Sequence, residues 1–147
     1  MSELRAQRIA VVEDWFRALG EGDVDGMERH HTADIVWELM PGPAEAHVPW
    51  TGRFEGRAGV ETCMAAWGGA VEGGEEGIVL GEILAGGGDT LAVPGHTEVT
   101  AKTTGRRFRM EFVEFFRFRG DKIAFMKVYS DTAAARAALA GEQGGRP

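Results

Sequence analysis

Residues Arg106 to Arg119 read RRFRMEFVEFFRFR, and their side chains alternate in character with a period of two. Such alternation is typical of a β-strand with one buried face. Beyond Arg106 at its start, one face is apolar except for a single glutamate, and it carries Phe108, Met110, Phe112, Glu114, Phe116 and Phe118. The pattern therefore aims the carboxyl group of Glu114 at an apolar interior.

Short turns flank this strand. The turn Thr103-Thr104-Gly105 precedes it, and Gly120-Asp121 follows it. Strands joined by turns this short pair antiparallel, so the segments 91–101 and 122–130 are its predicted neighbours. A further strand over 78–85, ending at the glycine-rich residues 86–89, extends the same antiparallel meander.

Helical periodicity dominates the rest of the chain. Ile9, Val12, Phe16 and Leu19 repeat at the spacing of one helix face, which predicts a helix over 4–19. Asp23 or Asp25 is the predicted cap of a short second helix. A strand over 35–40, a long loop over 41–55, a helix over 57–71 and a closing helix over 131–139 complete the order.

This order predicts a single α+β domain over 1–140, with 141–147 as a flexible tail. Three to four helices would pack on the concave side of a strongly bent antiparallel sheet. The result is a cone-shaped barrel, whose interior is a natural pocket for a small molecule.

Composition narrows the function further. The net charge is −7, which argues against nucleic-acid binding. The chain has no apolar run of about 20 residues and no N-terminal export signal, so we expect no membrane span and a cytoplasmic setting. Cys63 is the single cysteine, and the four histidines lack metal-ligand spacing, so we expect neither a metal nor another cofactor.

Three segments together carry a resemblance to a known fold: VVEDWFRALGEGDVDG at 11–26, WTGRFEGRAGV at 50–60 and VEFFRFRGDKI at 113–123. In their order and spacing they resemble the nuclear transport factor 2-like superfamily, over nearly the whole chain. Its enzyme branches include ketosteroid isomerase, limonene epoxide hydrolase and the SnoaL-like polyketide cyclases. The resemblance also implies a homodimer that pairs through the open sheet face.

The resemblance assigns roles to two of these residues. Glu114 matches the position where ketosteroid isomerases hold a protonated acid, and burial would keep its carboxyl protonated as a donor or general acid. A bulge that turns Glu114 to solvent, or a buried salt bridge, is the alternative. Trp15 stands where the isomerase has its catalytic tyrosine, and an indole N–H can only donate.

Two other catalytic positions of the family are apolar in this chain. Leu39 stands where the isomerase carries its general base, and Val128 where the cyclases and epoxide hydrolases carry an aspartate. The neighbouring Glu38 would reach the pocket only after a one-residue shift of its strand, and the alternation favours an outward direction.

A compensating base could come from His96, oriented by Glu98. A three-residue loop over 103–105 would turn both side chains into the pocket. A two-residue loop over 104–105 would instead turn Thr97 and Val99 inward, and would leave His96 and Glu98 in solvent near Glu111 and Arg109. Turn chemistry leaves both registers open.

The remaining candidates lie near the predicted mouth and at helix ends. Asp131 matches a recurrent acidic position of the family, although an aspartate entering a helix is ordinarily an N-cap. His47 and Trp50 lie on the long loop, where Trp50 is either a lid or a packing residue. We expect one of His30 and His31 to cover the cone and the other to be exposed.

These observations lead to one functional hypothesis and one alternative. The hypothesis is a SnoaL-like enzyme that performs cofactor-free isomerisation, cyclisation or epoxide opening on an apolar molecule. The predicted ligand site comprises Trp37, Glu38, Leu39, His47, Trp50, Met110, Phe112, Met126 and Val128. The alternative is a non-catalytic binding or assembly module of the same fold, which a solitary Glu114 in an apolar cavity would favour.

Overall fold

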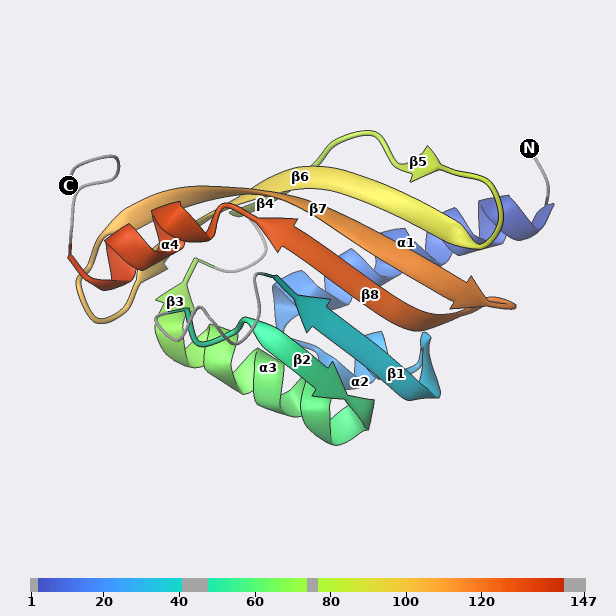
Figure 1. Ribbon diagram of the computed structural model, residues 1–147, viewed down its shortest axis with the longest axis horizontal. Helices are drawn as coiled ribbons and strands as arrows, with labels where there is room; N and C mark the ends of the chain where they lie inside the picture. The colour runs from blue at the N-terminus through green and yellow to red at the C-terminus, as the bar shows by residue number, and fades with distance from the viewer. Residues whose placement is uncertain (1–2, 41–47, 74–76, 142–147) are drawn as a thin grey trace.

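A strongly curled sheet with helices on its concave side forms the architecture (Figure 1), and the computed structural model describes residues 3–40, 48–73 and 77–141. The helices within these ranges are α1 (Glu3–Glu21), α2 (Val24–Glu28), α3 (Gly56–Ala70) and α4 (Thr132–Leu139). The strands are β1 (His31–Leu39), β2 (Gly52–Glu55), β3 (Val71–Glu72), β4 (Ile78–Leu80), β5 (Leu84–Ala85), β6 (Thr90–Ala101), β7 (Arg107–Arg119) and β8 (Lys122–Ser130). The predicted α+β class and its bent sheet are confirmed.

The sheet has the order β2-β1-β8-β7-β6-β3, and β4 and β5 also pair with β6. The meander β6-β7-β8 is antiparallel, as its short turns require. The pairing of β1 with β8 is parallel, so the sheet is mixed rather than wholly antiparallel. These two strands lie far apart in the sequence, and no tight turn dictates their relative direction.

The alternation along β7 holds over the whole strand. All six residues of its predicted apolar face, from Phe108 to Phe118, are buried, and the intervening residues are exposed or half-buried. On the concave side Trp15 of α1 packs edge-to-face on Phe116, with ring centroids 5.1 Å apart. Phe16 stacks on Phe112 at 6.3 Å. The core therefore lies between α1 and the middle of the meander.

The connection between β6 and β7 decides which side chains of β6 face inward. It is a four-residue loop, Lys102 to Gly105, closed by a hydrogen bond of 2.8 Å from the Ala101 N–H to the Arg106 carbonyl. Gly105 occupies the left-handed region with φ +73°, where a residue without Cβ is favoured. Neither the three-residue nor the two-residue loop forms, but the four-residue loop turns the same side chains inward as the two-residue one.

Helix starts follow the predicted capping chemistry. The Asp23 carboxylate accepts from the Gly26 N–H at 2.9 Å and caps α2, so Asp23 rather than Asp25 is the cap.

The long predicted loop contains β2, which pairs with β1, and the strand predicted over 78–85 is divided into β4 and β5. In the described part of the chain, no helix combines the length and apolar character needed to cross a membrane.

Candidate functional site

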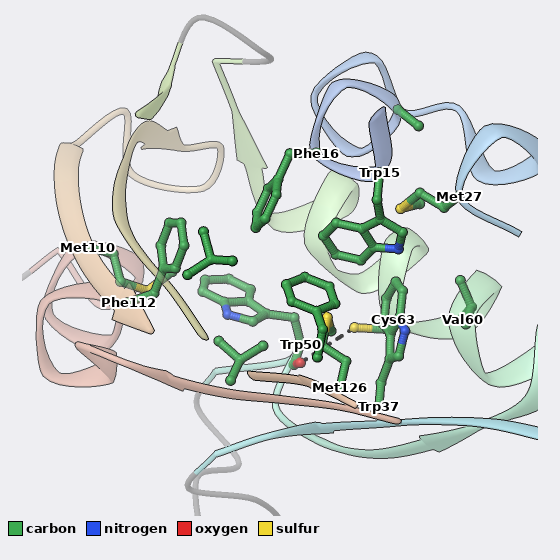
Figure 2. Close-up of a cluster of buried hydrophobic side chains, with 14 of the residues drawn as sticks. Trp15, Phe16, Met27, Trp37, Trp50, Val60, Cys63, Met110, Phe112 and Met126 are labelled. Atoms are coloured by element: carbon green, nitrogen blue, oxygen red, sulfur yellow. Dashed lines mark hydrogen bonds between the residues drawn. The ribbon is translucent and has the colours of Figure 1, made fainter. Parts of the chain in front are cut away.

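An apolar cavity of about 100 Å³ lies between the concave face of the sheet and helices α1 and α3. Seven residues of the predicted ligand site line it: Trp37, Leu39, Trp50, Met110, Phe112, Met126 and Val128. Figure 2 shows how Trp15, Phe16, Trp37, Trp50 and Phe112 surround this space with aromatic rings. Strand alternation explains why the strand residues of this set line the cavity, because β1, β7 and β8 each turn every second side chain inward.

Glu114 contributes the one carboxyl group among the described residues that line this cavity. Its side chain is directed inward from the middle of β7, between Val93 on β6 and Val128 on β8, and the residue is only 6% exposed. Burial raises the pKa of Glu114 from 4.5 to about 8, and within the described chain no charge or hydrogen bond offsets that effect. At neutral pH the group is mainly a carboxylic acid, able to donate one hydrogen bond into an apolar space.

Cys63 lies beside this acid. Its thiol contacts the Trp50 carbonyl oxygen at 3.6 Å, the interaction drawn as a dashed line in Figure 2. Burial, and in second place the negative charge on Glu114 when it ionises, raise the pKa of Cys63 to about 12. Cys63 is therefore a neutral thiol that helps to hold Trp50, and it is a poor nucleophile at neutral pH.

Trp15 forms part of the cavity wall, but its donor is engaged elsewhere. The indole N–H donates to His31 Nε2 at 2.9 Å, and Figure 2 shows the indole nitrogen on the side away from Trp50. Because Nε2 accepts, the neutral His31 ring carries its proton on Nδ1, which donates to Glu28 at 3.2 Å. Burial lowers the pKa of His31 and keeps the ring neutral. These hydrogen bonds fix the Trp15 ring and leave its own N–H unable to donate to a ligand, which corrects the role expected of Trp15.

The β6–β7 register places His96 and Glu98 on the outward face of the sheet. His96 pairs across the ladder with Glu111, and Glu98 with Arg109, while Thr97 is buried on the inner face. Neither His96 nor Glu98 lines the cavity, so the expected base and its orienting partner do not meet Glu114. The cause is the four-residue loop, since an odd number of loop residues would have reversed the two faces of β6.

Two further candidates also lie outside the cavity. Asp131 is exposed, and its carboxylate caps α4 by accepting from the Ala134 N–H at 3.2 Å. Glu38 is directed outward from β1 and forms ion pairs with Arg53 and Lys127. Capping and surface pairing account for both carboxylates.

The two predictions near the mouth have different outcomes. Trp50 is 2% exposed and packs edge-to-face on Trp67 with centroids 4.7 Å apart, so it is a packed wall residue. His47 lies outside the described residues. One of the two adjacent histidines was expected to be covered, and His31 is buried. The other was expected to be exposed, but His30 is half-buried against Asp14.

Seven residues at the cavity had no predicted role there: Phe16, Leu19, Cys63, Met64, Trp67, Ile78 and Ser130. Thr97 was expected to face inward in only one of the two loop registers. Phe16 and Leu19 share the helical stripe that carries Trp15, so their periodicity could have placed them there. Met64 and Trp67 likewise share the apolar face of α3. Placing Thr97 at the cavity required knowing the length of the β6–β7 loop. For Cys63, no pattern in the neighbouring sequence indicated a position at the cavity. Among the described residues, no three His, Cys, Asp or Glu side chains form a group that could hold a metal ion.

Comparisons with known proteins agree with this geometry. A sequence model described as the SnoaL-like domain matches residues 12–126. An NTF2-like protein from Burkholderia xenovorans is 27% identical, with a TM-score of 0.74 over 91% of this chain and 96% of that one. TerC, co-crystallised with polyporic acid, is 21% identical, with a TM-score of 0.79 over 91% and 98%.

A third solved structure also shares the fold. It is a protein of ketosteroid isomerase-like fold from Catenulispora acidiphila, in complex with trimethylamine, and it is 15% identical. Its TM-score is 0.72 over 93% of this chain and 96% of that one. Among curated proteins, none matches this chain significantly.

Proposed function

The chain belongs to the SnoaL-like family, and we propose that its cavity binds an apolar small molecule through one oxygen atom that accepts a hydrogen bond. The observation that carries the proposal is Glu114, a buried acid with a pKa of about 8 amid apolar side chains. A protonated carboxyl group in such a place has a hydrogen-bond donor to offer to an oxygen atom of a ligand. Two proteins of this fold contain small molecules in their solved structures, polyporic acid and trimethylamine, which supports a ligand-binding role.

The reaction that we propose is cofactor-free acid catalysis by Glu114. A carboxylic acid that donates to a carbonyl or epoxide oxygen stabilises the negative charge that develops there during enolisation, cyclisation or ring opening. The isomerase, polyketide cyclase and epoxide hydrolase types of chemistry all need this assistance. Trp37, Trp50, Phe112 and Met126 would position the apolar part of the substrate and exclude water.

The second candidate is binding without turnover, and a specific observation favours it. Within the described chain, the ionisable groups lining the cavity are Glu114 and the neutral thiol of Cys63. His96, Glu98, Glu38 and Asp131 all lie elsewhere, so among the described residues no general base lines the cavity beside the acid. Proton removal would then fall to solvent, which limits the rate that Glu114 alone can support.

A pair of cyclic ketones separates the two candidates. Calorimetry with 2-cyclohexen-1-one measures binding of a ring that carries one oxygen. Absorbance then follows the isomerisation of 3-cyclohexen-1-one, in which a proton leaves carbon 2 and another arrives at carbon 4 while Glu114 holds the oxygen. The enzyme is supported if the wild type turns over this ketone and Glu114→Gln does not, while the variant keeps part of the affinity for 2-cyclohexen-1-one. An amide donates a hydrogen bond but cannot act as an acid.

The matched control is Glu111→Gln, on the same strand but on its exposed face. It should bind and turn over as the wild type does. Glu114→Leu should weaken binding by about two- to tenfold, the effect of one lost hydrogen bond. Binding without turnover selects the second candidate, and full turnover by Glu114→Gln would show that Glu114 is not the acid.

A further inference from the structure

A second and larger hollow adjoins the cavity. Its volume is about 470 Å³, and it lies between the C-terminal end of α1, helix α3 and the strands around β6. Five residues line both spaces: Leu19, Met64, Trp67, Ile78 and Thr97. These five residues, which we call the neck, form the boundary between the cavity and the outer hollow.

Thr97 leaves a polar group unsatisfied at this neck. The residue is 5% exposed, and its hydroxyl has no hydrogen-bond partner among the described residues. Buried hydroxyl groups in native proteins are ordinarily paired, so an unpaired one at the boundary of two hollows indicates a missing partner. Thr97 and Glu114 lie on adjacent strands with the same inward direction, four residues apart in register, or about 13 Å along the sheet.

Among the described residues, the charged side chains that line the outer hollow are all acidic. Its charged lining residues in the described chain are Glu21, Glu61 and Glu72. Arg17 pairs with Glu21 and Arg57 with Glu61, whereas Glu72 is exposed on β3. A cationic group would be stabilised in this hollow, and a carboxylate would be repelled.

We propose that the outer hollow is a second subsite for the same ligand. In this arrangement an apolar ring occupies the cavity, with its oxygen at Glu114. A polar linking atom contacts the Thr97 hydroxyl in the neck, and a tail that ends in an ammonium group extends into the outer hollow. The inference rests on the proposed function, and it adds that the substrate class is a ring with an amine-terminated side chain.

Four phenols test the subsite by calorimetry. Phenol alone reports the cavity, and 4-(4-aminobutoxy)phenol adds both the linking oxygen and the ammonium tail. The analogue 4-(5-aminopentyl)phenol replaces the linking oxygen by a methylene group, and 4-(4-hydroxyphenoxy)butanoic acid carries a carboxylate tail. The aminobutoxy compound should bind more tightly than phenol by about tenfold or more, because several methylene groups leave water.

Two neighbouring glycines provide a matched pair of variants. Gly68 lines the outer hollow and Gly69 does not, and a Cβ atom at either position would meet no atom within 4 Å. Gly68→Phe should remove most of the gain from the tail and leave phenol affinity unchanged. Gly69→Phe should change neither affinity. Equal affinities of the two variants for the aminobutoxy compound would overturn the subsite.

Two further variants examine the chemistry of the subsite. Thr97→Val should abolish the preference for the linking oxygen over the methylene group, a difference of about two- to tenfold in the wild type. Glu72→Gln should reduce the preference for the ammonium over the carboxylate tail by about two- to fivefold. Absence of both preferences in the wild type would overturn the proposed substrate class. Failure of the proposed function is recognised separately, since Glu114→Leu would then leave the affinity for phenol unchanged.

Discussion

Replacing Glu114 by glutamine should remove a large pH dependence from the stability of this protein. The folded chain holds the Glu114 proton up to a pKa of about 8, whereas the unfolded chain releases it near the ordinary value of 4.5. Between these values the folded state binds the additional proton, so the free energy of unfolding falls as pH rises. Below pH 4.5 both states are protonated, and above pH 8 both are ionised, so the dependence is confined to this window.

The magnitude follows from the separation of the two values. A difference of about 3.5 pH units at about 1.4 kcal/mol per unit amounts to roughly 5 kcal/mol across the window. Glutamine does not ionise, so Glu114→Gln escapes this loss. Relative to the wild type, the free energy of unfolding of the variant should therefore rise by about 1.4 kcal/mol for each unit of pH between 5 and 8.

Urea unfolding of both proteins at several pH values measures the difference directly. Subtracting one curve from the other cancels the groups that the two proteins share, including His31, whose lowered pKa acts in the opposite sense. Glu111→Gln, on the exposed face of the same strand, should follow the wild type throughout. A difference between Glu114→Gln and the wild type that stays constant from pH 5 to 8 would refute the burial of an acid at this position.

Other substitutions test the surroundings of the cavity. His31→Phe removes the acceptor of the Trp15 N–H and should cost about 1–3 kcal/mol in urea unfolding; an unchanged midpoint would contradict a structural role for that bond. Asp131→Ala should cost about 1 kcal/mol through loss of the α4 cap while leaving phenol affinity intact, and weaker phenol binding would return Asp131 to the site. We also expect a homodimer through the open sheet face, where Phe115 and Tyr129 are 37% and 48% exposed. Sedimentation should find Phe115→Lys monomeric, and a monomeric wild type would disprove that expectation.

Much of the fold could be predicted because its signals are local. The alternation from Phe108 to Phe118 requires only the period-two geometry of a strand, and it placed Glu114 correctly on the inner face. The stripe along α1 requires only the helical period. Capping at Asp131 follows from one side chain and the backbone three residues on. Each of these features depends on neighbours in the sequence.

The site depended more on distant contacts, and there sequence reasoning was less complete. A single residue of loop length sets which face of β6 is inward, and thereby excluded His96 and admitted Thr97. The partner of the Trp15 N–H is His31, which lies on another element and shares no periodic pattern with it. Cys63 on α3 likewise lies near Glu114 on β7, although no sequence pattern links these two elements.

The sequence by itself determined that an acid on a β-strand is directed into an apolar interior, because strand geometry imposes that alternation wherever the strand lies. Only the tertiary structure decided that no second ionisable carboxyl or imidazole group lines the described part of the cavity beside this acid. It also decided that β1 pairs in parallel with β8 and that a second hollow meets the cavity at Thr97. These features arise from packing between segments far apart in the chain, whose relative positions no local period encodes.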